Sequence, residues 1–235
     1  MSDLRYDGRD LEAMSFARNY HEWILSLFSR LIGERVAEVG AGSGSFTELL
    51  LKESVEEIVA IEPSSEMYVR LEKNTAHDTR VVCKNEFFAD LSPQYLEYFD
   101  SVVYVNVLEH VEKDAEELTH VYQSLKPGGH VCIFVPALMW LYSAHDKHIG
   151  HFRRYHKAPL KALVQSAGFE VVQVRYFDIV GVLPWFVLMT LLKTHPAAGS
   201  VDFYDRVVVP FSRVFESFVP LPFGKNLFIV GQKPL

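Results

Sequence analysis

A glycine-rich turn after an apolar segment constrains this chain more than any other feature. Residues 36–39 read Val-Ala-Glu-Val, which is typical of a short strand, and Gly40, Gly42 and Gly44 follow at alternate positions. Glycines let the backbone turn sharply and approach a ligand closely, which a Cβ atom would block. The residues from Phe46 onward predict a helix that points free N–H groups at the same ligand. The pattern therefore predicts a strand, a nucleotide-binding turn and a helix in an α/β fold.

The spacing of the glycines and a nearby acid favour one class of ligand. Dinucleotide-binding turns have the pattern G-x-G-x-x-G and hold a pyrophosphate, whereas here the third glycine, Gly44, comes one residue early. Glu38 is expected at the carboxyl end of the strand, where a carboxylate repels a pyrophosphate and attracts a cation. S-adenosylmethionine (SAM) carries a sulfonium and an ammonium group and no phosphate. The segment with Glu38, Gly40, Ala41 and Gly42 therefore favours SAM as cofactor, with S-adenosylhomocysteine as product.

A second acidic residue supports a ligand that contains a ribose. Residues 56–62 read as an apolar strand that ends in Glu62. Glu62 lies about 20 residues beyond the turn, where a carboxylate binds ribose hydroxyls in nucleotide-binding folds. NAD enzymes share this feature, so it predicts a ribose and leaves the chemistry open. The alternative is an exposed acid at the end of a strand.

Segments typical of helices and of strands alternate along the chain. Helices are expected at 10–31, 46–52, 65–74, 112–125 and 158–167. Strands are expected at 36–39, 58–61, 80–83, 101–105, 130–135, 170–177 and 227–232, with a Lys-Pro-Gly-Gly turn at 126–129. The alternation predicts a doubly wound α/β sheet, for which 235 residues with 49% hydrophobic content suffice to build one large core.

Four motifs in a fixed order resemble those of the class I SAM-dependent methyltransferase family. They are the glycine turn at 38–44, the acid Glu62, the fourth-strand segment 99–111 and the segment 125–131. The resemblance covers residues 30–177 and 225–233. It implies that residues 1–235 form a single methyltransferase domain with a Rossmann-like sheet of seven strands. In this family the last strand lies antiparallel beside the fifth.

The resemblance also implies positions around the cofactor. Asn106 offers its backbone carbonyl to the ammonium group of SAM, and Leu108 and His110 line the path toward the methyl group. His110 has an alternative role as a residue that only caps backbone groups at the start of a helix. Pro63 and Met67 are expected beside the cofactor, where Met67 either lies under the adenine or fills the core.

The adenine side departs from the family pattern. Many relatives carry a Gly-Asp pair after the third strand, whereas the matching segment 84–90 reads Lys-Asn-Glu-Phe-Phe-Ala-Asp. Glu86 or Asn85 is therefore expected to bind the adenine amine. Phe87 is expected to stack on the adenine ring.

A segment after the fifth strand carries the residues expected to face the methyl acceptor. Residues 140–157 contain four of the ten histidines and four Lys or Arg residues of an otherwise acidic chain. Loops at the carboxyl ends of parallel strands face the ligand crevice of such a sheet. The segment is therefore expected to bind the substrate.

Three interpretations of this segment remain open. His145, His148 and His151 are spaced three apart, which would gather a metal ion on one helical face, although a glycine within the segment argues against it. A structural loop with solvated charges is the second interpretation. In the favoured third, Arg153 or Arg154 binds a carboxylate or phosphate of the acceptor, one histidine acts as general base, and no metal is bound.

Two further segments are expected to cover the site. Residues 1–31 are predicted to form a helical cap in which Tyr20 touches the cofactor or acceptor, with a helix packed only on the sheet as the alternative. Residues 178–225 are a predicted helical insertion between the sixth and seventh strands. Its apolar run at 179–192 is shorter than the ~20 residues that span a bilayer. A cap over the acceptor, a homodimer interface and a peripheral membrane contact remain open.

Charge and composition limit which compartment and which partners are expected for this chain. The net charge of −7 and the pI of about 5.8 argue against a nucleic-acid binder, which needs a basic surface. The polar N-terminus lacks the regions of a secretory signal. Cys83 and Cys132 fall in segments expected to be buried, which suits reduced thiols. The chain is therefore expected in the cytoplasm.

Residues and resemblance together predict an enzyme that methylates oxygen or nitrogen of a small anionic acceptor with SAM. The sequence Gly-His-Phe-Arg-Arg-Tyr at 150–155 resembles a bacterial branch of the family that accompanies glycan, lipid-linked sugar and secondary-metabolite pathways. A metabolite, a sugar or a lipid-linked glycan precursor is therefore the expected acceptor. The alternatives are methylation of tRNA or protein, and a non-catalytic SAM-binding protein.

Overall fold

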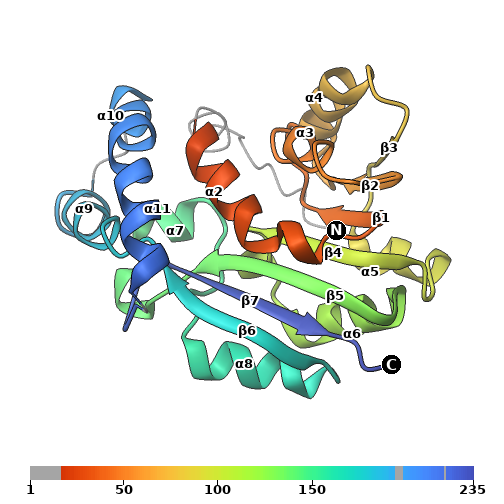
Figure 1. Cartoon of the computed structure of the whole chain (residues 1–235). Helices are drawn as coiled ribbons and strands as arrows, with labels where there is room; N and C mark the ends of the chain where they lie inside the picture. The colour runs from red at the N-terminus through yellow and green to blue at the C-terminus, as the bar shows by residue number, and fades with distance from the viewer. Residues whose placement is uncertain (1–16, 194–197, 220) are drawn as a thin grey trace.

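The centre of the structure is a sheet of seven strands in the order β3-β2-β1-β4-β5-β7-β6 (Figure 1). In the computed structural model, which describes residues 17–193, 198–219 and 221–235, the strands are β1 Arg35–Val39, β2 Glu57–Ile61, β3 Val81–Lys84, β4 Phe99–Val105, β5 Leu125–Pro136, β6 Glu170–Phe177 and β7 Asn226–Gln232. Strands β1 to β5 pair in parallel, whereas β7 runs antiparallel between β5 and β6. The expected fold class is confirmed.

Helices cover both faces of this sheet. Before β4 they are α2 Arg18–Phe28, η1 Ser29–Leu31, α3 Thr47–Leu50, α4 Ser65–Thr75, α5 Phe88–Leu91 and η2 Ser92–Gln94. Between β4 and β6 they are η3 Leu108–His110, α6 Asp114–Ser124, η4 Met139–Leu141, α7 Ala144–His148 and α8 Lys157–Ser166. Between β6 and β7 they are α9 Val182–Trp185, η5 Phe186–Leu191, α10 Ala198–Phe203, η6 Tyr204–Val208 and α11 Val209–Phe218.

The alternation of side chains along each strand builds two hydrophobic cores. On β4 and β5, Val102 and Ile133 face the core that α5, α6 and α8 cover, whereas Val103 and Phe134 face the core beneath α2 and α3. Successive strand residues point to opposite faces, so a strand buried on both faces is apolar throughout. This is why segments 102–105 of β4 and 131–135 of β5 read as continuous apolar runs in the sequence.

The register of the central strands brings the expected cofactor residues to one edge. Val39, the last residue of β1, pairs with Ile61 of β2 and with Tyr104 of β4. The glycine turn, Glu62 and Asn106 follow these three strand ends directly. Asn106 has φ +54°, a left-handed conformation that asparagine adopts more readily than most residues, and its N–H donates to the Phe134 carbonyl at 2.8 Å.

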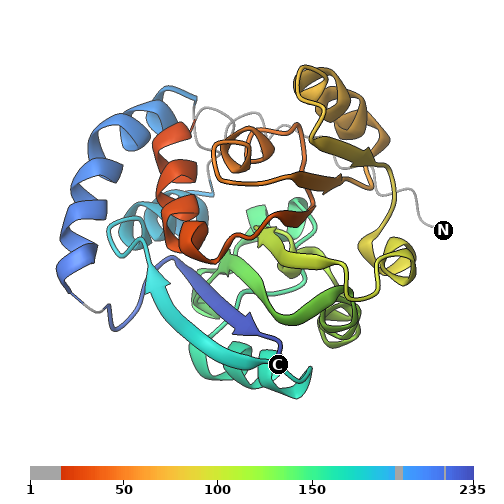
Figure 2. The same ribbon diagram turned by 45° about the vertical axis from the view of Figure 1, so that its right-hand side comes forward.

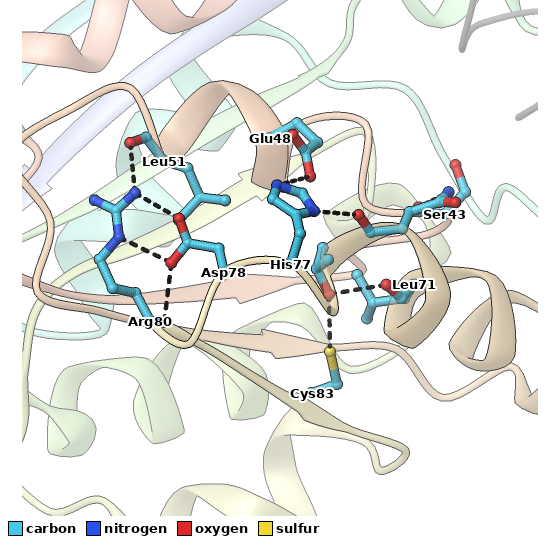
Figure 3. A network of polar contacts seen from close by, with 10 residues as sticks. Ser43, Glu48, Leu51, Leu71, His77, Asp78, Arg80 and Cys83 are labelled. Carbon is cyan, nitrogen blue, oxygen red and sulfur yellow. Dashed lines mark hydrogen bonds and ion pairs between the residues drawn. The ribbon is translucent and has the colours of Figure 1, made fainter.

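A network of polar contacts supports the glycine turn from the outside (Figure 3). The Asn74 amide in α4 donates to the Ser43 carbonyl in the turn at 2.9 Å. Arg80, just before β3, pairs with Asp78 at 2.7 Å and donates to the Leu51 carbonyl at 3.1 Å (Figure 3). These contacts fix α3 and α4 against the segment that leads into β3.

The insertion between β6 and β7 packs beside α2, as both ribbon views show (Figures 1 and 2). The carboxylate of Asp205 accepts hydrogen bonds from the backbone N–H groups of Asn19 and Tyr20, at 3.1 and 2.8 Å. An acidic group at this position satisfies free N–H groups at the start of α2. The helix expected from residue 10 begins at Arg18, and residues 10–16 lie outside the described residues.

Asp178 joins the insertion to the sheet. Its buried carboxylate pairs with Lys225 at 2.8 Å and accepts hydrogen bonds from the Tyr204 hydroxyl at 2.5 Å and the Gly181 N–H at 2.9 Å. The Tyr20 hydroxyl of α2 lies 3.2 Å from the same carboxylate. Within the described part of the chain, each helix is too short or too polar to cross a lipid bilayer.

Two expectations from the sequence are wrong. Residues 126–129, expected as a turn, belong to β5, because Gly128 donates to the Lys233 carbonyl and Lys233 donates to the Gly129 carbonyl. The ladder with the C-terminal segment therefore starts earlier than the apolar run. Cys132 is buried as expected, but Cys83 is only half-buried, because β3 is an edge strand of the sheet.

Candidate functional site

A cavity of about 220 Å³ lies at the carboxyl edge of the central strands. Its lining includes Glu38 and the glycine turn after β1, the segment after β4, the segment around α7, and parts of α2 and the insertion. Among the lining residues are Tyr20, Glu38, Gly40, Ala41, Gly42, Asn106, Glu109, His110, His145, His151, Arg154, Trp185 and Lys225. Residues far apart in the sequence thus share one cavity.

The glycine turn is held in a conformation that only glycine adopts readily. Gly40 has φ +71°, and a Cβ atom there would lie 2.4 Å from Cγ2 of Val107. The Gly40 N–H donates to the Ile61 carbonyl at 2.8 Å, and the Gly42 N–H donates to Glu62 Oε2 at 2.9 Å. The end of β2 therefore fixes the turn after β1.

Glu62, the residue expected to bind the ribose, directly follows β2 and is not among the residues that line the cavity. It is buried, its Oε1 accepts a hydrogen bond from the Ser64 N–H at 2.8 Å, and burial raises its pKa. A carboxylate offers about four lone-pair positions, so two protein donors leave capacity for ribose hydroxyls. The carboxylate is thus oriented by the backbone before any ligand binds.

Glu38 is a buried acid on the cavity wall. Its Oε2 accepts a hydrogen bond from the Thr47 hydroxyl at 2.6 Å. Burial raises the pKa of Glu38 to about 8, against the lowering effect of the Thr47 hydrogen bond. No ion pair joins Glu38 to a cation among the residues that the structure describes. A buried carboxylate beside a Cβ-free turn fits the sulfonium and ammonium groups of SAM.

Several residues expected beside the cofactor lie outside the cavity lining, among them Gly44 of the turn. Pro63 and Glu86 are exposed, and Phe87 is 54% exposed. Met67 and Leu108 are fully buried side chains. Their roles toward the cofactor stay predictions.

The histidine-rich segment divides between the cavity and the surface. His145, His151 and Arg154 line the cavity, as do Tyr20 and His110. His148 is exposed. Arg153 pairs with Asp114 at 2.8 Å and donates to the Glu112 carbonyl at 2.7 Å, outside the lining.

Asp146 organises the cavity side of this segment. Its Oδ1 lies 2.7 Å from Arg154 Nε and 3.0 Å from His151 Nδ1, and its Oδ2 accepts hydrogen bonds from the Ser143 N–H and hydroxyl, both at 2.9 Å. Burial raises its pKa, but the His151 hydrogen bond and the Arg154 charge hold that pKa well below its usual range. A fully hydrogen-bonded carboxylate therefore orients both side chains.

Glu109 and His110 lie next to His151. His151 Nε2 is 3.6 Å from Glu109 Oε1, and the His110 and His151 rings are 4.6 Å apart between centroids. Burial raises the pKa of Glu109 to about 7 and lowers that of His110 to about 4. The three side chains come from η3 and from the segment after α7.

The insertion contributes Trp185 and borders the cavity. The Arg154 guanidinium lies 4.7 Å from the Trp185 ring centroid, and the His145 ring lies 5.8 Å from it, edge to face. Lys225 Nζ lies 5.0 Å from the centre of the Tyr20 ring. The cavity wall thus includes side chains from both segments expected to cover the site.

Sequence reasoning missed four of these residues as site residues. Glu109 directly precedes His110, and Asp146 directly follows His145. This proximity to predicted site residues was the signal in the sequence that could have identified both acids. Trp185 and Lys225 lie in the insertion, and no pattern in the sequence places them at the cavity. Only the packing of the insertion does so.

Comparisons with known proteins agree with this architecture. Residues 9–174 match the family model described as a methyltransferase domain. The uncharacterized protein Rv1509 of Mycobacterium tuberculosis is 30% identical over 138 residues, which are 55% of this chain and 45% of that protein. The chain thus spans less than half the length of that curated relative.

Solved structures share the fold at low identity. A methyltransferase of Haloferax volcanii, solved in complex with the Trm112 methyltransferase activator, has a TM-score of 0.68 at 19% identity, with 100% of both chains covered. The N-methyltransferase NodS of Bradyrhizobium japonicum, solved with S-adenosylhomocysteine, has a TM-score of 0.62 at 16% identity, with 94% of this chain and 88% of that chain covered. The chain belongs to the methyltransferase domain family, and its fold is the one shared by SAM-dependent methyltransferases.

Proposed function

We propose that this protein transfers a methyl group from SAM to an oxygen or nitrogen atom of a small anionic acceptor. The observation that carries the proposal is the shared cavity, in which the glycine turn and the polar side chains of Glu109, His151 and Arg154 line one space. Methyl transfer depends mainly on holding the acceptor about 3 Å from the methyl carbon. One cavity lined by both groups of residues supports the proposal.

The residues divide into a cofactor side and an acceptor side. SAM, when bound, supplies a methyl group on a positively charged sulfur. Glu38 offers a carboxylate to the positive end of the ligand, and Glu62 offers lone pairs to the ribose. Arg154 and Lys225 line the cavity wall, each paired with a buried acid, and their N–H groups support the proposal of an anionic acceptor.

The test is transfer of a labelled methyl group from SAM into a fractionated extract, followed by mass identification of the product. We expect the label in a small acidic molecule, and we expect Glu62→Ala to lose most of the transfer, because the ribose contact is removed. Label found only in the protein or RNA fractions would contradict the proposed acceptor class. Label that is equally strong with Glu62→Ala would contradict the proposed cofactor side.

Partners and compartment stay at the level of proposals. The net charge of −7 supports the expectation of no nucleic-acid partner. Helix α11 exposes the apolar side chains of Phe211, Val214, Phe215 and Phe218 at helical spacing. This stripe is the surface that we expect to contact a second copy of the chain or a membrane surface. The cytoplasm remains the expected compartment.

A further inference from the structure

Three potential metal ligands gather on the acceptor side of the cavity. Glu109, His110 and His151 each place a ligand atom within 4.8 Å of the others. His151 Nε2 lies 3.6 Å from Glu109 Oε1, close to the separation of two ligands on one metal ion. The histidines at 145 and 148, which the sequence spacing had grouped with His151, are not in this cluster.

Glu109 is the feature that most needs a ligand. Its side chain is fully buried, and neither carboxylate oxygen is within hydrogen-bond distance of a donor side chain among the described residues, since His151 Nε2 is 3.6 Å away. Burying a carboxylate without partners is costly, and most buried polar atoms in proteins have one. The carboxylate faces the cavity beside His110 and His151. A bound cation would satisfy both oxygens.

Each of the two histidines makes a second contact that orients its ring. His151 Nδ1 is hydrogen-bonded to Asp146 Oδ1 at 3.0 Å, so Nε2 is the nitrogen on the side of Glu109. His110 is hydrogen-bonded to the backbone of Gly150. Metal-binding histidines almost always use their second ring nitrogen to contact a carboxylate or a backbone carbonyl. The cluster therefore has the support that such sites require as well as the ligand atoms.

We propose that Glu109, His110 and His151 bind a divalent transition-metal ion. Two imidazole nitrogens and one carboxylate oxygen form a donor set that suits Zn²⁺, Fe²⁺ or Mn²⁺ better than Mg²⁺ or Ca²⁺, which prefer oxygen ligands. Three protein ligands leave at least one coordination position open. No metal was expected from the sequence, because the three residues are not spaced as a motif and meet only in the fold.

The open coordination position would let the ion bind the methyl acceptor. This role rests on the proposed function. An acceptor hydroxyl bound to the ion would lose its proton to water more easily, because a divalent cation stabilises the resulting oxyanion. The charges around the site agree with this role. Glu109 and Asp146 are acids and Arg154 is a cation, so the group is net negative when both acids are ionised, and a divalent ion makes it positive. An anionic acceptor would then be attracted.

The test measures metal binding directly, without SAM and without turnover. The full chain is freed of metal with a chelator and titrated with Co²⁺, with the visible absorption of the bound ion as the signal, and with Zn²⁺ in a calorimeter. We expect one equivalent to bind to the wild-type protein. Glu109→Gln and His110→Gln should weaken binding at least about 100-fold, and His148→Ala, which removes an exposed histidine of the same region, should bind as the wild type does.

Binding of S-adenosylhomocysteine to each variant, measured separately, reports folding and tests the proposed function on its own. Saturable metal binding that Glu109→Gln removes while S-adenosylhomocysteine still binds supports the inference. Absence of saturable binding to the wild type, or equal binding to Glu109→Gln, overturns it. Loss of binding in His148→Ala alone would move the site to the surface histidines and also overturn it.

Discussion

At the scale of single residues, Gly40 shows why the turn after β1 requires glycine. Its φ of +71° and the distance of only 2.4 Å between Val107 Cγ2 and the position that a Cβ atom would take both exclude a side chain. We expect Gly40→Ala to weaken S-adenosylhomocysteine binding at least about 10-fold, because the left-handed conformation alone costs roughly 1–2 kcal/mol for alanine. Calorimetric titration measures the effect. Gly199→Ala, where no atom lies within 4 Å of a new Cβ, is the matched control and should bind normally.

Glu38 is expected to release a proton when SAM binds. Its pKa of about 8 means that most molecules without ligand carry a proton on this carboxyl at pH 7. A cationic ligand favours the carboxylate and lowers that pKa, so SAM binding should release up to about one proton per site at pH 7, and affinity should rise with pH until about pH 8. Calorimetry in two buffers with different ionisation enthalpies measures the release. Equal release from Glu38→Gln would rule out Glu38 as its source.

At the residue level, the sequence predicts positions where they depend on local spacing, and the roles of these residues stay predictions. Glu38 lies near the end of the apolar run of β1, Gly40 and Glu62 directly follow β1 and β2, and the parallel pairing of these two strands brings them to one edge. Arg153 and Arg154 are neighbours in sequence, yet only Arg154 lines the cavity, because the Arg153 side chain is held by Asp114. Which of two neighbours faces inward depends on partners about 40 residues away, so spacing cannot reveal it.

At the scale of elements, Asp178 connects the end of β6, the insertion and α2. It is fully buried, has φ +60° and pairs with Lys225, whose side chain is 19% exposed. We expect Asp178→Asn to lower the free energy of unfolding by about 2–3 kcal/mol. Asparagine keeps the backbone conformation but leaves the lysine charge without its partner, a loss eased by partial exposure.

Chemical denaturation measures this change. Arg206→Ala is the control, because it removes an exposed pair with Asp202 on the same insertion and should cost only about 0.3–0.5 kcal/mol. Equal destabilisation by the two substitutions would show that Asp178 does not hold the insertion to the sheet.

The elements themselves were predictable to different degrees. The segments 102–105 of β4 and 131–135 of β5 are unbroken apolar runs, so the positions of these strands followed from the sequence, whereas the antiparallel place of β7 followed from the family resemblance. The Lys-Pro-Gly-Gly segment was read as a turn because of its residue types, and pairing with Lys233 at the far end of the chain overrides that local preference. In the insertion, the apolar run is continuous, so its sequence does not indicate which side chains face the cavity and which face outward.

At the scale of the whole molecule, the cavity joins two groups of residues that are far apart in the sequence. Histidines, Arg154 and Lys225 form one group, and the glycine turn after β1 forms the other. The largest exposed apolar side chains of α11 are Phe218 at 81% and Phe211 at 77%. Contact of this stripe with a second copy or with a membrane surface stays a prediction, because neither contact follows from the position of the cavity.

The central claim is that the turn from Gly40 to Gly44 and the acid Glu62 form a SAM site. Calorimetric titration of the wild-type chain and of Glu62→Ala with S-adenosylhomocysteine tests it most directly. We expect one binding site in the wild type and a loss of affinity of roughly 10–100-fold in the variant, since hydrogen bonds to a charged group contribute about 1.5–3 kcal/mol. Absence of binding to a folded wild-type chain, or equal binding to both proteins, would contradict the claim.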